Sequence, residues 1–220
     1  MNQTQLDKHL VTVALCGEND RVQKLVESGA NLDYARPNGT PLVQAARHGH
    51  HETVSVSMKE GAEKYNTDCN GRTALHWAIA NRDREMIEVL WKTSSDAKRT
   101  SQHGTALQLA VKLHYPDILE LLLKKGAISS SCLPHFATPL FEALKAHVLD
   151  RRTPNRCTDT VRVLMRYCNV NARTLAGDTP LALAASSDLV PVMKILFDNG
   201  AKINIRNDEG QTPLIYAIEN

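Results

Sequence analysis

The sequence predicts an all-α fold in which pairs of short helices, separated by turns, repeat along the chain. A Thr-(Pro/Ala)-Leu tripeptide recurs six times, starting at Thr40, Thr73, Thr105, Thr138, Thr179 and Thr212. The intervals are 33, 32, 33, 41 and 33 residues, and a period of this length indicates a helical repeat array. Hydrophobic residues make up 42% of the chain and aromatic residues 5%, which favours an aliphatic helical core over a β-sandwich.

Each tripeptide predicts the start of the first helix of a pair. The threonine hydroxyl can accept a hydrogen bond from a backbone N–H of the first turn, and proline fits there because its missing N–H would have no partner. Alanine follows at a fixed distance and lets neighbouring helices approach closely, at Ala45–Ala46, Ala78, Ala110, Ala143, Ala184–Ala185 and Ala217.

The second helix of a pair is predicted to end at a Gly-Ala dipeptide. Four such dipeptides close apolar stretches, at Gly29-Ala30, Gly61-Ala62, Gly126-Ala127 and Gly200-Ala201. Glycine suits the left-handed residue that follows a helix. A helix pair this short cannot bury its apolar face alone, so we expect stability to come from stacking of neighbouring pairs.

These motifs resemble the signature of the ankyrin repeat. The segments Gly71–Ala78, read as GRTALHWA, and Gly177–Leu181, read as GDTPL, are similar to its T-P-L-H-x-A pattern. The resemblance covers nearly the whole chain. It implies an ankyrin-repeat α-solenoid, in which paired short antiparallel helices are joined by β-turn or hairpin loops. The first unit keeps the helix pattern without the tripeptide, as a terminal repeat often does.

We predict that residues 1–220 form a single ankyrin-repeat domain. The expected units are 5–36, 37–69, 70–101, 102–134, 135–175, 176–208 and an incomplete unit, 209–220. The 41-residue interval indicates an insertion near residues 149–157, which we expect to form an exposed loop around Asp150–Arg156. The last unit stops after one helix, which suggests a piece of a longer protein. Polar Thr53 and Ser57 stand where apolar residues are expected, so the packing of unit 37–69 is predicted to be weaker.

Charge bears on the class of partner, and cysteine content bears on the cellular compartment. The formal net charge is +2 with 23% charged residues of mixed sign, so charge alone indicates neither a nucleic-acid nor a membrane partner. Five widely spaced cysteines without a C-x-x-C pair argue against a disulfide framework and favour the cytoplasm or nucleus. No segment approaches the roughly 18 continuous apolar residues of a membrane-spanning helix.

Candidate chemical sites are sparse. The segment His48–Glu52 is rich in metal-ligand types, but it resembles an ankyrin turn in which histidine is structural, so no metal is predicted. Two groups combine a nucleophile with a base or acid but lack the surroundings of a catalytic motif, namely Cys132 with His135, and Cys157 with His147 and Asp159. Glycine-rich phosphate loops are also absent. We therefore predict no enzyme activity, catalytic residue, cofactor or small-molecule substrate for this chain.

Two residue types have a functional and a structural interpretation. Trp77 and Trp91 could form an aromatic cage for a methylated lysine, but packing in the core is favoured. Asn171 and Asn204 resemble the turn asparagine that can be hydroxylated in the ankyrin family. Stabilisation of the turn by the asparagine side chain is the favoured role.

The resemblance implies a binding strip along the concave side of the repeats, formed by residues just before each threonine and at the end of the first helix. On this sequence, the predicted partner-binding residues are Arg36, Arg47, His48, Asn70, Arg72, Asn81, Gln102, Lys112, His135 and Lys145. The corresponding late positions turn acidic, with Asp178, Asp208 and Glu209. We expect an acidic peptide or domain as partner over the early repeats, because opposite charges speed and orient association. The alternative is a set of ordinary solvated charges.

The favoured function is protein–protein interaction, as a scaffold, adaptor or substrate-recruiting region. One alternative is a targeting array of a larger enzyme or effector whose catalytic domain lies outside this chain. A second is nucleic-acid binding through Arg151, Arg152, Arg156, Arg162 and Arg166, which is disfavoured because no interleaved aromatic residues are present to stack on bases. No membrane partner is expected.

Overall fold

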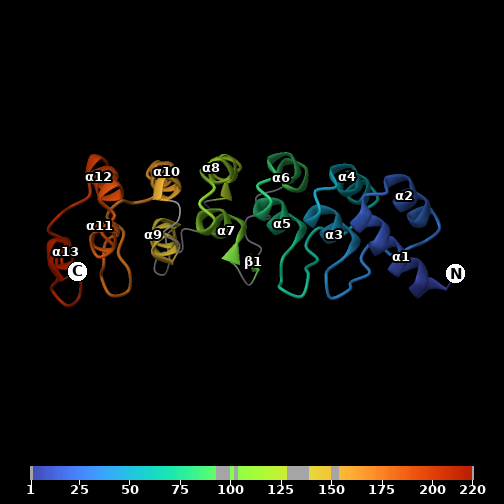
Figure 1. Cartoon of the computed structure of the whole chain (residues 1–220), viewed down its shortest axis with the longest axis horizontal. Helices are drawn as coiled ribbons and strands as arrows, with labels where there is room; N and C mark the ends of the chain where they lie inside the picture. Colours follow the sequence, from blue (N-terminus) through green and yellow to red (C-terminus); the bar gives the residue numbers. More distant parts are fainter. Residues whose placement is uncertain (1, 93–99, 102–103, 128–138, 150–153, 220) are drawn as a thin grey trace. The chain divides into compact units, whose positions relative to one another are not determined.

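A computed structural model describes residues 2–92, 100–101, 104–127, 139–149 and 154–219 (Figure 1). The chain divides into two compact units, Met1–Leu109 and Ala110–Asn220, which we call the first and second units. Both are built from pairs of short helices, which confirms the predicted all-α fold.

Three helix pairs lie within residues 2–92 of the first unit. Their helices are α1 (Gln3–Cys16), α2 (Asn19–Glu27), α3 (Pro41–Arg47), α4 (His51–Lys59), α5 (Ala74–Ala80) and α6 (Arg84–Leu90). Helix α3 packs between α1 and α5, and α2 packs against α4. We call the first helix of each pair the inner helix and the second the outer helix; in this unit they form the lower and upper rows of Figure 1. The turns that precede the inner helices therefore lie beside one another.

The second unit repeats this arrangement. Helix α7 (Ala106–Lys112) crosses the boundary between the units and is followed by α8 (Pro116–Lys124), α9 (Pro139–Leu149), α10 (Pro154–Leu164), α11 (Pro180–Ala185), α12 (Val190–Asp198) and α13 (Pro213–Glu219). Helix α11 packs between α9 and α13, and α10 packs between α8 and α12. The core is aliphatic, as the composition predicts.

Two of the loops before inner helices contain the predicted β-pairing. Strand β1 (Thr100–Ser101) pairs antiparallel with β2 (Gly104–Thr105), and an isolated antiparallel bridge joins Arg36 to Gly39. The bridge needs a glycine because Gly39 has a φ of 108°, a conformation that strains residues with a side chain.

Threonines of four tripeptides, Thr40, Thr73, Thr105 and Thr179, cap inner helices as predicted. The Thr179 hydroxyl accepts a hydrogen bond from the Ala182 N–H at 3.2 Å, and Thr40 and Thr73 make the same contact with the residue three positions later. Most of the alanines that follow are completely buried in inner helices, namely Ala45, Ala78, Ala110, Ala143 and Ala184, whereas Ala217 of α13 is exposed. Small side chains thus lie where neighbouring helices pack.

The predicted exposed loop around Asp150–Arg156 is wrong for its second half. Pro154–Arg156 form the first turn of α10, whereas residues 150–153 lie outside the described residues. Helices α9 and α10 have 11 residues each, against 7 and 9 in α3 and α4. The reason is that Pro154 suits a first turn, and Cys157, Val161 and Leu164 are buried at helical spacing.

The polar residues of α4 are buried in the first unit. Thr53 and Ser57 are both 0% exposed. The Thr53 hydroxyl donates to the Asn19 side-chain oxygen, whereas the Ser57 hydroxyl has no hydrogen-bond partner among the described residues. The sequence pattern thus identified two buried polar residues. Weaker packing of unit 37–69 stays a prediction.

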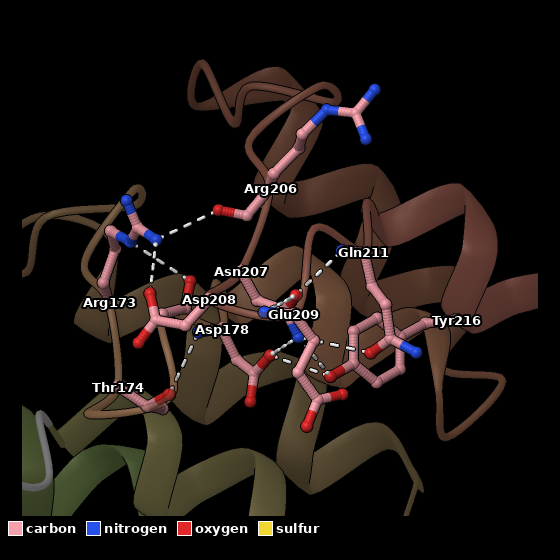
Figure 2. Close-up of polar contacts among 10 residues, drawn as sticks. Arg173, Thr174, Asp178, Arg206, Asn207, Asp208, Glu209, Gln211 and Tyr216 are labelled. Atoms are coloured by element: carbon pink, nitrogen blue, oxygen red, sulfur yellow. Dashed lines mark hydrogen bonds and ion pairs between the residues drawn. The ribbon is translucent and has the colours of Figure 1, made fainter.

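A polar network fixes the last loop of the second unit (Figure 2). One carboxylate oxygen of Asp178 accepts hydrogen bonds from the Tyr216 hydroxyl at 2.8 Å and from the Asn207 amide at 3.0 Å. Burial raises the pKa of Tyr216, and its hydrogen bond to Asp178 raises that pKa further. The Arg173 guanidinium lies 3.3 Å from the Asp208 carboxylate. Asp178 and Asp208, which belong to the acidic late positions, therefore contact other residues of the second unit.

Candidate protein-interaction site

Two arginine side chains, from successive repeats, contact the ring of Trp77. The guanidinium carbons of Arg47 and Arg72 lie 4.6 and 4.7 Å from the centroid of the Trp77 ring. Arg47 is the last residue of α3, Arg72 precedes the capping Thr73, and Trp77 lies in the middle of α5. A guanidinium over an indole ring is stabilised by about 0.5–1 kcal/mol at an exposed site. We call Arg47, Arg72, Trp77 and the adjacent Asp68 the Trp77 cluster.

Asp68 fixes the geometry of the Trp77 cluster. One of its carboxylate oxygens accepts a hydrogen bond from the Trp77 indole N–H at 3.0 Å. The other accepts from the backbone N–H groups of Asn70 at 2.9 Å and Arg72 at 3.0 Å. Asp68 is 7% exposed, and these hydrogen bonds compensate for the desolvation of its charge. The indole and the turn before Thr73 are therefore held together.

Asn81 fixes the backbone that carries Arg47. Its side-chain amide donates a hydrogen bond to the Arg47 carbonyl oxygen at 2.9 Å. This contact satisfies a terminal carbonyl of α3 from the following repeat, where the helix itself provides no partner. Asn81, predicted to contact a partner, therefore has a positioning role in the free protein.

The predicted core position of Trp77 is wrong, whereas that of Trp91 is confirmed. Trp91 is 7% exposed, but Trp77 is only half-buried. The reason is that the neighbours of Trp77 include two guanidinium groups and a carboxylate, which keep one side of the indole at the polar surface. The sequence already contained a sign of this polar environment: Arg47 ends one inner helix, and Arg72 comes just before the next.

The other predicted partner-binding residues are dispersed. In the first unit, Asn70 is exposed on the turn of Arg72, and His48 is exposed with its ring stacked on His50 at a centroid distance of 6.3 Å. In the second unit, the Lys112 ammonium lies 3.8 Å from the Glu142 carboxylate, and Lys145 is exposed on α9. Gln102 and His135 lie outside the described residues.

Arg36 lines a different feature of the first unit. It borders a depression of about 240 Å³ between α1 and the turn at residues 36–39. Neither Arg36 nor Arg47 forms an ion pair with any residue that the structure describes. The basic character of the predicted strip is thus strongest in the first unit, because Lys112 has an acidic neighbour.

The histidines of the segment His48–Glu52 make separate contacts. The His50 ring contacts the Leu15 carbonyl oxygen at 2.8 Å. His51 uses its two ring nitrogens in different directions, one 2.8 Å from the Asp83 carboxylate and the other 3.9 Å from the Glu85 carboxylate. Within the described residues, no three His, Cys, Asp or Glu side chains gather as a metal site.

Cys157 has the properties of a core residue. It is completely buried, and burial raises the pKa of its thiol from 9.0 to about 11. Nucleophilic attack requires the thiolate, so this thiol is a poor nucleophile at neutral pH. Asp159 pairs instead with Arg162 at 2.8 Å. The other members of the two groups, Cys132, His135 and the side chain of His147, lie outside what the structure describes.

The arginine cluster of the nucleic-acid alternative is partly neutralised within the second unit. Arg166 lies 3.5 Å from Glu120, and Arg162 pairs with Asp159, while Arg156 is exposed. Arg151 and Arg152 fall outside the described ranges. No helix in the described part of the chain is both long and apolar enough to span a bilayer.

Asn171 has the predicted role in a turn. Its amide donates to the Gly200 carbonyl oxygen at 3.1 Å, and its side-chain oxygen accepts from the Lys202 N–H at 2.9 Å. The side chain thus links the loops of two successive repeats, whereas Asn204 is exposed.

Comparison with known proteins finds relatives that contain the same kind of repeat. The family model described as "Ankyrin repeats (3 copies)" matches residues 9–101, 57–132 and 146–220. The human B-cell lymphoma 3 protein is 27% identical over 222 residues, which cover 96% of this chain and 47% of that protein. The probable E3 ubiquitin-protein ligase XBOS32 of Oryza sativa subsp. japonica is 28% identical over 201 residues, covering 89% of this chain and 38% of that protein. The chain therefore spans less than half the length of these relatives.

Solved structures confirm the predicted α-solenoid fold class. The crystal structure of the ankyrin repeat domain of Bcl-3 has a TM-score of 0.78 at 24% identity and covers 94% of this chain and 92% of that chain. The human ASB11 ankyrin repeat domain has a TM-score of 0.71 at 24% identity, with 94% and 90% covered. At these identities the likeness shows the fold alone.

Proposed function

We propose, from the premise that this chain belongs to the ankyrin-repeat family, that it binds a partner protein along its concave side through the Trp77 cluster. Ankyrin repeats are a protein–protein interaction module, and the proposal adds the surface and the chemistry of the partner. In this proposal the chain serves as a scaffold, adaptor or substrate-recruiting region in the cytoplasm or nucleus.

The observation that carries the proposal is the placement of two guanidinium groups on one indole ring. Arginine and tryptophan are enriched among the residues that dominate binding energy at protein interfaces. The contacts at 4.6 and 4.7 Å, together with the Asp68 hydrogen bonds, hold long side chains that would otherwise lose rotamer freedom on binding. Pre-ordering of this kind favours association.

The partner surface is proposed to be acidic. Arginine offers a planar set of N–H donors that matches a carboxylate in a bidentate geometry. Exposed Arg47 makes no ion pair with a described residue, and exposed Arg36 and Lys8 add positive charge in the same unit. Complementary charge of this kind acts mainly on the association rate and on orientation.

A charge-reversal experiment tests this proposal. A partner is first captured from lysate with the wild-type chain, and its affinity is then measured by calorimetry for the double variant Arg47→Glu/Arg72→Glu. The matched control is Lys24→Glu/Lys59→Glu, which makes the same change of charge at exposed positions of α2 and α4. We expect the first pair to weaken binding by about tenfold or more and the control to change it little. Equal effects of the two pairs would refute the proposed surface.

A second candidate function follows from the rice relative. That protein is named a probable E3 ubiquitin-protein ligase, and 89% of this chain aligns with 38% of it. The repeats would then recruit a substrate to a catalytic region outside residues 1–220. Incubating the captured partner with the whole natural protein tests this candidate, because modification of the partner supports it and binding without modification favours a scaffold.

A further inference from the structure

The depression beside α1 is a second feature that suits a protein partner. Its volume is about 240 Å³, and it is bordered by Val11, Thr12 and Leu15 of α1, by Arg36, Pro37 and Asn38 of the turn that precedes α3, and by Gln44 of α3. We call it the α1 groove. All of these residues belong to the first unit. The sequence pattern identified Arg36 but not the three residues of α1.

The wall of the α1 groove is fixed by hydrogen bonds. Arg36 and Gly39 exchange backbone hydrogen bonds at 3.2 and 2.7 Å. The Pro37 carbonyl oxygen accepts from the Cys69 N–H at 2.9 Å, and the buried Gln44 amide donates to the Asn38 carbonyl oxygen. A wall that is already ordered loses little conformational entropy when a ligand binds.

The surface of the α1 groove is mainly apolar. Leu15 is 38% exposed, one of the large hydrophobic residues of the protein that remain in contact with solvent. Exposed Pro37 and Val11, which is 4% exposed, also line the groove. Pockets for drug-sized molecules or cofactors usually measure roughly 300–1,000 Å³. The smaller groove suits one aliphatic side chain.

The edge of the α1 groove is basic. Arg36 is exposed there, and Lys8 lies one helical turn before Thr12 on the same face of α1. The described lining residues include no aspartate or glutamate. Asp7 is 6% exposed and already accepts hydrogen bonds from the Asn31 N–H and the Gln3 amide. The charge at this edge therefore complements an acidic segment.

We propose that the α1 groove binds a single aliphatic side chain, such as leucine, from a partner segment whose flanking residues are aspartate or glutamate. This inference deepens the proposed function and rests on it, because it adds an apolar anchor to an electrostatic surface. The anchor supplies sequence specificity that charge alone does not give, since an aliphatic side chain gains free energy only where it leaves water.

Peptide titration tests the α1 groove directly. The probe is a nine-residue peptide of alternating Glu and Asp with leucine at its centre, compared with the same peptide carrying alanine and with one in which lysine replaces the acidic residues. Methyl NMR spectra report Val11 and Leu15 of the labelled protein. We expect the leucine peptide to shift both methyl signals, the alanine peptide to bind about tenfold or more weakly, and the lysine peptide to cause no shift. Unshifted methyl signals, or equal binding of the leucine and alanine peptides, would overturn the proposal.

Two phenylalanine variants place the bound peptide. Thr12→Phe adds a ring at the edge of the groove and is expected to abolish the methyl shifts. His9→Phe adds the same ring at an exposed position of α1 outside the groove lining and is expected to preserve them. If the spectrum of Thr12→Phe shows unfolding, Arg36→Glu takes its place and is expected to weaken the acidic peptide severalfold. Retained affinity in the folded groove variant overturns the proposal.

The same variants separate this proposal from the proposed function. A captured partner that is lost by Arg47→Glu/Arg72→Glu but retained by Thr12→Phe refutes the α1 groove and leaves the Trp77 cluster intact. A partner that is lost only by Thr12→Phe supports the groove and refutes the Trp77 cluster as the centre of binding.

Discussion

At the residue scale, two buried polar side chains of α4 differ in their hydrogen bonding. Thr53 donates to Asn19, but Ser57 has no hydrogen-bond partner in the described residues. A buried hydroxyl without a partner costs about 1–3 kcal/mol in desolvation. We expect Ser57→Ala to raise the free energy of unfolding by about 1 kcal/mol in urea titrations. Thr53→Val is the control and should not stabilise the protein, because it removes a formed hydrogen bond. A clear loss of stability in Ser57→Ala would contradict this expectation.

The thiol of Cys157 gives a pH-dependent prediction. Its pKa is raised to about 11 by burial, from an ordinary value of 9.0. Below pH 9 both the folded and unfolded chains hold the proton, so the full stability is present. As pH rises from 9 to 11 the unfolded thiol ionises first, and the free energy of unfolding should fall by up to about 2–3 kcal/mol. Urea titrations at pH 8 and pH 10.5 should show a larger loss for the wild type than for Cys157→Ala. Equal losses would exclude this thiol as the cause.

At the scale of the helices and turns, Asn81 links stability to the proposed binding surface. Its hydrogen bond to the Arg47 carbonyl oxygen holds the end of α3. We expect Asn81→Ala to lower the free energy of unfolding by about 1 kcal/mol and to weaken partner binding through the position of Arg47. The control for stability is Asn70→Ala, since the Asn70 side chain is exposed and the contact of that residue with Asp68 uses its backbone. The positioning role would be contradicted if both variants unfolded at the same denaturant concentration.

The helices themselves could be predicted because their signals are local. Threonine caps, prolines in first turns and apolar spacing depend on a few neighbouring residues, and the structure confirms them at Thr40, Thr73 and Thr179. The extent of α10 was missed because the 41-residue interval was interpreted as a loop insertion, whereas the buried face of the helix begins only at Cys157. The spacing of the tripeptides gives the length of an insertion, but not its division between helix and loop.

The candidate site was only partly predictable for a related reason. The resemblance selected positions within each repeat, and Arg47 and Arg72 were among them. Their meeting at Trp77 depends on how an inner helix packs against the next repeat, which the sequence of a single repeat does not specify. The α1 groove joins residues about 25 positions apart and has no sequence motif.

At the scale of the whole molecule, the prediction of a single domain can be tested by unfolding. Both tryptophans, Trp77 and Trp91, lie in the first unit, so their fluorescence reports that unit. Circular dichroism reports the helices of both units. If repeats couple through their neighbours along the whole chain, the two signals should give coincident urea transitions. Two separate midpoints would show that the first and second units unfold independently.

The proposed function requires a partner protein to cover the inner helices and turns of the first unit. Hydrogen–deuterium exchange with and without the captured partner tests this claim, because backbone protection locates contact without any substitution. We predict slower exchange at residues 36–48 and 68–81, which carry Arg36 and the Trp77 cluster, with unchanged exchange over the outer helix α4 (His51–Lys59). Protection confined to the outer helices, with residues 36–48 and 68–81 unchanged in a saturated complex, would contradict the claim.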